Sequence, residues 1–306
     1  ASLHRIYDVF VYSNSGTPTL ELNAWDSGGQ VTGTITAITA ALPAVVTSNS
    51  HGLSNGQFVF IDGANNTVGT NTAQGVNGKC AVVANVSANT FELEGMDTSG
   101  LAASTSGTFY KMPTARTDAV AFQDGVLVKS GTPTRRYVGS IKTVASAQTE
   151  DSSTKRLVYN YYNRATRLFV CKDTTSGGWT WTSSGGARPA NANTAPGAGR
   201  IEILTGISDE VVRIDIKGGT TASAAYGSVG LGINTTATST VDGCSSLGST
   251  VNMQWDGVKV AVPPLGYSFW QRLDVEGPGS FTPSFSGSAS IHPDINLNVL
   301  AGIVSQ

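Results

Sequence analysis

Apolar and polar residues alternate with a period of two along much of the chain. The clearest case is VVRIDIK (211–217), where Val212, Ile214 and Ile216 alternate with charged residues. Successive side chains of a β-strand point to opposite faces of a sheet, so this pattern is typical of a strand with one buried face. The segment is therefore predicted to be a strand.

The same pattern predicts strands elsewhere. In residues 6–13 an apolar face (Tyr7, Val9, Val11) alternates with a mixed one (Asp8, Phe10, Tyr12). Clusters of Gly, Asn, Asp, Ser and Pro interrupt the strands at intervals of about ten residues, as in antiparallel sandwiches and barrels. No long segment has an amphipathic helical pattern. Further strands are predicted at 17–22, 135–143, 156–162, 164–172 and 201–206. The predicted fold class is an all-β, antiparallel, jelly-roll-like sandwich.

Residues 31–111 differ from the sequence on either side. They contain several short apolar strands of their own, among them QFVFIDG and KCAVVANVS, and the turn-like HGLSNG. A structureless loop of this length is improbable inside a compact domain. We expect a small β-barrel or meander domain at 31–111, inserted between residues 1–30 and 112–306 of the sandwich. A nested domain needs neighbouring ends, so Trp25 and Arg116 should lie close together.

Composition agrees with this fold and excludes several functions. Hydrophobic residues make up 40% of the 306, charged residues 13%, and there are 36 glycines, a balance that favours short strands and turns over helical bundles. A formal net charge of -2 gives no basic footprint for nucleic acid. No apolar run is long enough for a membrane span, and no signal peptide is evident. The chain opens ASLHRIYDVF without Met, which we interpret as a processed product or a fragment.

Cysteines and histidines give no sign of a disulfide framework or a metal site. Cys80, Cys171 and Cys244 are odd in number and lack a CxxC pair, which predicts free, mostly buried thiols in a protein assembled in reducing cytoplasm. The three histidines are far apart and none has a ligand partner two to four residues further along the chain. No metal or other cofactor is expected.

The chain has no recognisable catalytic motif. Three carboxylate pairs could in principle cleave a glycosidic bond: Glu150/Asp151, Asp209/Glu210 and Asp274/Glu276. Lys155 and Arg156 follow the first pair closely, so a structural ion pair is the favoured interpretation there. Asp209 lies in a turn-like ISDE segment, where Asp usually bonds the backbone. We therefore expect no enzymatic activity and name no catalytic residue.

Arginines and tyrosines gather between residues 135 and 167. Aromatic rings beside arginine could stack on nucleic-acid bases or on sugars. The same residue types also pack across strands and at subunit interfaces, and packing or an interface is the interpretation that we favour here. The candidate interface cations are Arg135, Arg136, Arg164 and Arg167; the candidate glycan or interface aromatics are Tyr159 and Tyr161.

Trp179 and Trp181 are separated by one residue, so they share one face of a predicted strand or hairpin. An exposed pair would form a platform for a sugar ring, and a buried pair would belong to the core. Core packing is the favoured alternative, although the glycine-rich flanks leave the question open.

Two stretches resemble known protein families. The pattern PAVVTSNSHGLSNGQFVFIDG, followed by VNGKCAVVANVSANTFELEGMDTSG, resembles a small β module of tailed-phage structural proteins. That module is itself similar to the first-catalytic-cysteine half-domain of ubiquitin-activating enzymes. The resemblance implies a fold and no ubiquitin chemistry, since Cys80 lies mid-strand without an adjacent base.

The flanking sequence resembles a module of phage virion surface proteins, including tail fibres. This resemblance is carried by YDVFVYSNSGTPTLELNAW, RTDAVAFQDGVLVKSGTPTRRYVGSIKT and EDSSTKRLVYNYYNR. In that module the first two stretches are joined by a short turn, whereas here the small β module is inserted between Trp25 and Arg116. It implies a structural component of an external phage appendage, located on the virion and involved in host attachment. The implied partners are further copies of the chain, commonly three in such fibres, other virion proteins and a host surface glycan. A capsid decoration or head-fibre protein and a glycan-cleaving spike remain as alternatives.

Overall fold

The computed structural model of the chain confirms the all-β prediction. All the secondary-structure elements assigned among the described residues are β-strands, and nearly all of their pairings are antiparallel. The jelly-roll arrangement stays a prediction. The described residues are 3–65, 75–163, 169, 171, 177–180, 186–190, 199–209, 211–221, 227–238, 252–276, 284–287 and 298–302.

One sheet contains the N-terminal strands. Its order is β10-β11-β12-β1-β2, with β13 and β15 also paired to the long strand β12. A bulge at Val9 and Phe10 shifts the register between β1 and β12. The strands are β1 (Ile6–Asn14), β2 (Thr17–Ala24), β10 (Val120–Gln123), β11 (Val126–Lys129), β12 (Thr132–Ala145), β13 (Gln148–Thr149) and β15 (Val158–Asn160).

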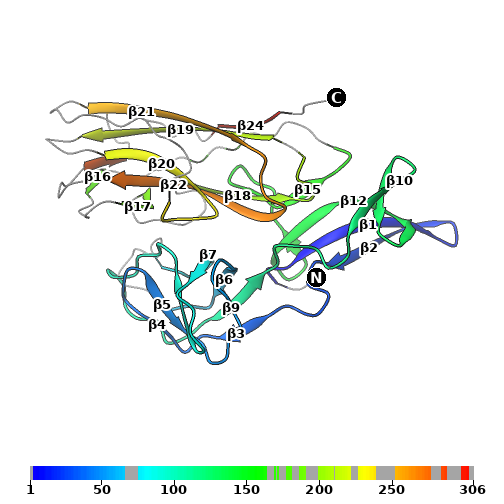
Figure 1. Cartoon of the computed structure of the whole chain (residues 1–306), viewed down its shortest axis with the longest axis horizontal. Coiled ribbons are helices and arrows are strands. Elements are labelled where there is room, and N and C mark those ends of the chain that lie inside the picture. The colour runs from blue at the N-terminus through cyan, green and yellow to red at the C-terminus, as the bar shows by residue number, and fades with distance from the viewer. Residues whose placement is uncertain are drawn as a thin grey trace.

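Two further sheets pack face to face as a sandwich, visible as the upper two layers of Figure 1. The first contains β14 (Lys155–Arg156), β17 (Gly186–Pro189), β18 (Arg200–Thr205), β20 (Gly227–Ile233) and β22 (Gly266–Glu276). The second contains β16 (Gly177–Thr180), β19 (Val211–Thr221), β21 (Asn252–Ala261), β23 (Ser284–Gly287) and β24 (Asn298–Gly302).

The sandwich core lies between these two sheets. Val212, Ile214 and Ile216 of β19 are buried there against Ile201 of β18 and Trp270 of β22. Arg213, between them, is exposed. The alternation predicted for 211–217 is thus confirmed for the side chains that the structure describes.

Residues 32–112 form a seven-stranded sheet in which each strand pairs only with other strands of this segment, in the order β3-β9-β6-β7-β8-β5-β4. We call this segment the small module. A bridge between Ile38 and Ser104 ties β4 to the segment that leads into β9. Its strands are β3 (Thr32–Thr34), β4 (Ala37–Ile38), β5 (Ala44–Thr47), β6 (Phe58–Asp62), β7 (Lys79–Ala84), β8 (Thr90–Leu93) and β9 (Thr108–Met112).

The small module has a hydrophobic core whose members, among the described residues, all belong to the module. Its buried members run from Ile35 to Phe109 and include Val59, Phe91 and Leu93. The HGLSNG segment turns where the sequence predicted, with Gly52 and Gly56 at positive φ. His51, the first residue of this segment, is buried, and its Nδ1 accepts a 3.0 Å hydrogen bond from the backbone N–H of Leu53.

A second apolar cluster joins the small module to the rest of the chain. Phe58, Cys80 and Met112 of the module pack with Leu204 and Phe269 of the sandwich, among others. Arg200, fully buried, donates a 2.8 Å hydrogen bond to the carbonyl oxygen of Cys80. The module is therefore fixed against the sandwich by buried contacts (Figure 1).

Two predicted strands differ from the structure in informative ways. Residues 156–162 do not form one strand: the pairing of β14 ends at Arg156, and β15 begins at Val158 on a different sheet. In β1 the mixed face is the more deeply buried one, with Asp8 and Phe10 at 0% exposure. A buried carboxylate with enough partners can lie in a core, which simple alternation does not predict.

Candidate functional site

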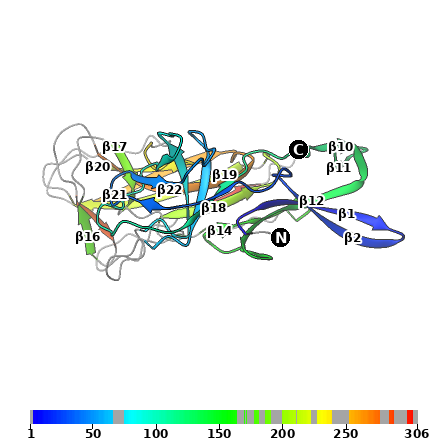
Figure 2. The same cartoon turned by 90° about the horizontal axis from the view of Figure 1, so that it is seen from below.

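The β1–β2 hairpin extends away from the body of the molecule in both views (Figures 1 and 2). β2 is the last strand of its sheet, and in the part of the chain that the structure describes it pairs with β1 along one edge only. Edge strands can pair with another chain. We call this hairpin the arm and treat it as the candidate interaction surface.

One face of the arm is apolar and uncovered. Val9 pairs with Leu22 and Val11 with Leu20 across the two strands, so the four side chains share a face. Leu20 is 68% exposed and Leu22 48% exposed. Contiguous exposed apolar side chains on a soluble protein commonly mark an interaction site. We call these four residues the apolar face of the arm.

The opposite face carries Glu21, whose charge is paired with cations of the neighbouring strands β11 and β12. Arg135 donates a 2.6 Å hydrogen bond to Glu21 and stacks 3.6 Å above the ring of Tyr12. Lys129 lies 3.4 Å from the same carboxylate. Burial raises the pKa of Glu21, but the hydrogen bond from Arg135 and the charge of Lys129 outweigh it, so the net shift is downward. This face therefore carries paired charges and differs in character from the apolar face.

Arg136, the second predicted interface cation, lies at the exposed surface beside the arm. Its Nε donates a 2.9 Å hydrogen bond to the hydroxyl of Tyr162, and the guanidinium lies 4.6 Å from that ring's centroid. Together with Val11, Tyr12 and Pro18 it lines a shallow groove of about 320 Å³ near the hairpin tip.

The two predicted tyrosines have different environments. Tyr159 is 8% exposed and packs with Phe10, Leu127 and Tyr137. Tyr161 is half-buried, with its ring 6.1 Å from Tyr137 and 5.0 Å from Tyr162. Tyr159 is thus a core residue, whereas part of the Tyr161 side chain remains exposed to solvent.

The remaining predicted site residues are described in part or not at all. Trp179 lies in β16, paired with Phe285 of β23, but its side chain is outside what the structure describes. Trp181, Arg164 and Arg167 lie outside the described residues.

A buried polar centre lies at the base of the arm, and sequence reasoning missed it. Asp8 accepts hydrogen bonds from Trp25 Nε1 at 2.8 Å, Ser140 Oγ at 2.7 Å and Arg116 Nε at 2.6 Å. Arg116 also donates to the carbonyl oxygen of Gly206. The only sequence signal was a charged residue inside the apolar strand 6–13.

Glu150 and Asp151, the first carboxylate pair considered for glycoside cleavage, are engaged in ion pairs. Glu150 lies 2.9 Å from Lys155, and Asp151 lies 3.1 Å from Arg156, which confirms the predicted pairing. Asp209 lies in a turn and its N–H donates to the carbonyl of Ile207. Among the described residues, no group of three or more His, Cys, Asp or Glu side chains could hold a metal ion.

The described cysteines are buried and free. Burial raises the pKa of the Cys80 thiol to about 12, so the thiolate needed for nucleophilic chemistry is not populated. Cys171 lies in the sandwich core, and its sulfur accepts a hydrogen bond from the N–H of Gly199. Cys244 is outside the described residues. In the described part of the chain, no helix is long and apolar enough to cross a membrane.

Comparison with known proteins adds no family assignment: no family model, no curated protein and no solved structure matches the chain.

Proposed function

We propose that this chain is a structural component of a tailed-phage particle, part of an external appendage of the tail-fibre or spike type that attaches to the host surface. The observation that supports this best is the arm. It projects from a rigid β body and exposes Leu20 and Leu22 next to Val9 and Val11. Such a face suits a subunit that is buried against neighbours in an assembly.

The junction of the small module with the sandwich also suits a mechanical role. Besides the apolar cluster, Thr236 donates a hydrogen bond to the carbonyl of Glu94, and Thr235 donates one of 3.2 Å to its carboxylate. A module held in this way transmits force to the sandwich without a flexible linker. Leu42 of the module is 52% exposed and is a residue that could contact a host surface.

Self-association is part of the proposal. Three copies are the expected number, which rests on the resemblance to phage fibre modules. Covering the apolar face of the arm with a neighbouring copy would remove Leu20 and Leu22 from water.

Competition with adsorption tests the attachment role. Purified protein added to host cells before the phage that encodes it should occupy the receptor and reduce adsorption in proportion to its concentration. An unrelated β protein of similar size serves as the control. If saturating protein leaves adsorption unchanged, the attachment role is wrong.

The rival function is a capsid decoration or head-fibre protein. Such a protein would bind capsids that lack it and leave adsorption unaffected, so the same preparation separates the two. The glycan-cleaving alternative has less support, because Glu150 and Asp151 are each paired with a neighbouring cation.

A further inference from the structure

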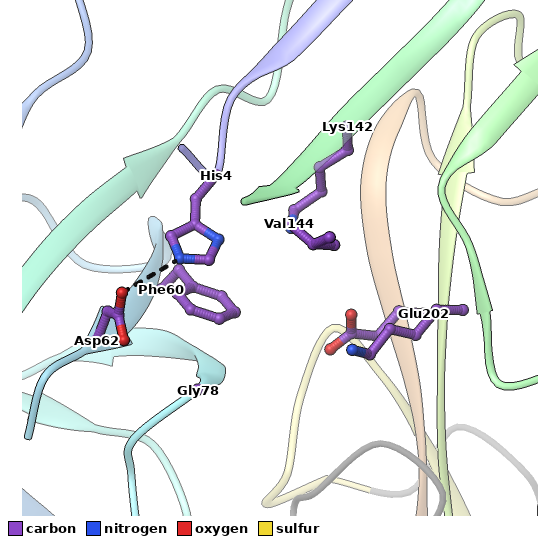
Figure 3. Close-up of a pocket in the computed structure, with 8 residues that line it drawn as sticks. His4, Phe60, Asp62, Gly78, Lys142, Val144 and Glu202 are labelled. Atoms are coloured by element: carbon purple, nitrogen blue, oxygen red, sulfur yellow. Dashed lines mark ion pairs between the residues drawn. The ribbon is translucent and has the colours of Figure 1, made fainter. Parts of the chain in front are cut away.

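A pocket of about 270 Å³ lies where the small module meets the rest of the chain (Figure 3). Phe60 and Asp62 of β6 form one wall, and Lys142 of β12 and Glu202 of β18 form the other. His4, just before β1, lies on the module side of the gap. This pocket is separate from the arm and plays no part in the function proposed above, so either proposal can hold without the other.

His4 contributes a buried acceptor to the pocket. The residue is 4% exposed, and its ring stacks on Phe60 with 3.6 Å between centroids. Nε2 lies 3.8 Å from the Asp62 carboxylate, which favours the tautomer with its proton on Nε2. Nδ1 is then a lone-pair acceptor. It is buried, and no hydrogen-bond partner for it exists among the described residues.

This nitrogen faces the empty part of the pocket. In Figure 3 one ring nitrogen is joined to Asp62, and the other points away from it, toward the wall formed by Lys142 and Glu202. Burial, followed by the charge of Lys142, lowers the pKa of His4 to about 4, so the ring is neutral near pH 7. A buried acceptor left without a hydrogen-bond partner is unfavourable, so a ligand that supplies a donor would relieve that cost.

The facing wall carries both a donor and an acceptor. The Lys142 side chain is almost fully buried, with its ammonium 5.3 Å from the ring centroid of Phe60 and 5.1 Å from that of Tyr267. Glu202 is 3% exposed, and its carboxylate points across the gap toward His4 and Phe60. Lys155, paired with Glu150 at 2.9 Å, completes the polar lining.

The lining carries side chains of both signs, Lys142 and Lys155 together with Asp62 and Glu202. A wall of this kind does not favour a small anion or a small cation. Donors and acceptors on opposite sides instead suit hydroxyl groups, each of which can donate and accept at once. The volume is at the lower end of ligand pockets, about 300 Å³, and fits one small ring.

We propose that this pocket binds one hydroxylated ring, a single monosaccharide unit, with a hydroxyl donating to His4 Nδ1 and others bonded to Lys142 and Glu202. Glycerol offers the same hydroxyl chemistry without a ring. Tighter binding of a monosaccharide than of glycerol would therefore show that the pocket recognises the ring and not adjacent hydroxyl groups alone.

The test uses the full chain with glucose, galactose, mannose and N-acetylglucosamine, and with glycerol and inorganic phosphate as comparisons. Saturation-transfer NMR and calorimetric titration should detect at least one monosaccharide. His4→Phe keeps the stack on Phe60 but removes the acceptor, and Glu202→Gln removes the facing carboxylate. Each should weaken binding by about tenfold or more, as expected for loss of one buried hydrogen bond. Tyr162→Phe, outside the pocket, should leave it unchanged.

A second measurement does not depend on how the variants fold. The ¹⁵N resonance of His4 Nδ1 in the unaltered protein should shift when the sugar is added, because a hydroxyl begins to donate to it. The proposal is overturned if no monosaccharide binds, if glycerol or phosphate binds better than every sugar, or if sugar binding leaves the Nδ1 resonance unmoved.

Discussion

The guanidinium of Arg116 lies 4.6 Å from the centroid of the Trp25 ring, although the whole small module separates the two residues in sequence. Both also bond Asp8, which is fully buried. The chain leaves the N-terminal sheet after Trp25, forms the module and returns at Arg116. The closeness of these two residues was predicted from the sequence and is confirmed.

Removing Arg116 should destabilise the protein strongly. Arg116→Ala leaves the buried Asp8 carboxylate without its charge partner, which typically costs about 3–5 kcal/mol. Urea unfolding followed by circular dichroism measures the loss. Arg136→Ala is the matched control, since its bond to exposed Tyr162 should be worth less than about 1 kcal/mol. Equal losses in both variants would refute the importance of the Asp8 centre.

The small module should fold when produced alone as residues 31–112. Its core includes Val59, Phe91 and Leu93, and every described member of this core lies within the module. Separation uncovers Phe58, Cys80 and Met112, so the isolated module should be less soluble than the whole protein. We expect one cooperative thermal transition. A featureless melt and unstructured NMR spectrum would show that 31–112 does not fold as an independent unit.

Stability should fall as the pH is lowered from about 6.5 to about 4. The pKa of His4 is about 4 in the folded protein and 6.5 as a model value, so in this interval the unfolded chain binds the extra proton. Below pH 4 both states are protonated and the contribution is constant. Because solvent screens part of the shift, a loss of about 2 kcal/mol is expected.

His4→Phe isolates this contribution, because the variant keeps every other titrating group. The difference in unfolding free energy between the two proteins should change with pH only between about 4 and 6.5. A difference that stays constant over that interval would mean that His4 does not titrate as described.

Charges placed on the apolar face of the arm should disrupt self-association. Leu20→Glu combined with Leu22→Glu puts two carboxylates where a neighbouring copy would pack, and both side chains are already exposed in the single chain. Light scattering after size exclusion should show a smaller oligomer, while the melting temperature of the monomer stays unchanged. Phe122→Glu, also at a 68% exposed residue but outside this face, should leave the oligomer intact.

The fold was predictable where alternation and burial coincide. Val212, Ile214 and Ile216 are apolar at every second position and all are buried. The module was predictable because its segment has its own turns and apolar strands. Which face of β1 is buried could not be predicted from the local sequence. Asp8 lies in the core with Phe10 because residues from distant parts of the chain supply its hydrogen-bond partners, namely Arg116, Trp25 and Ser140.

The site was predicted only in part. Arg135 and Arg136 do lie beside the arm, but Arg135 is fixed by Glu21 and Tyr12, neither of which the arginine cluster itself indicated. The exposure of Leu20 and Leu22 depends on which face of β1 is buried, a choice that local sequence leaves open. The pocket at His4 needs residues from β6, β12 and β18, so it arises only from tertiary packing.

Cryo-electron microscopy of the intact phage particle tests the central claim most directly. We predict density for this β sandwich and its small module in an external tail appendage, with Leu20 and Leu22 of each arm covered by a neighbouring subunit. The chain's absence from the particle, or its presence on the capsid alone with the arms exposed to solvent, would contradict the account.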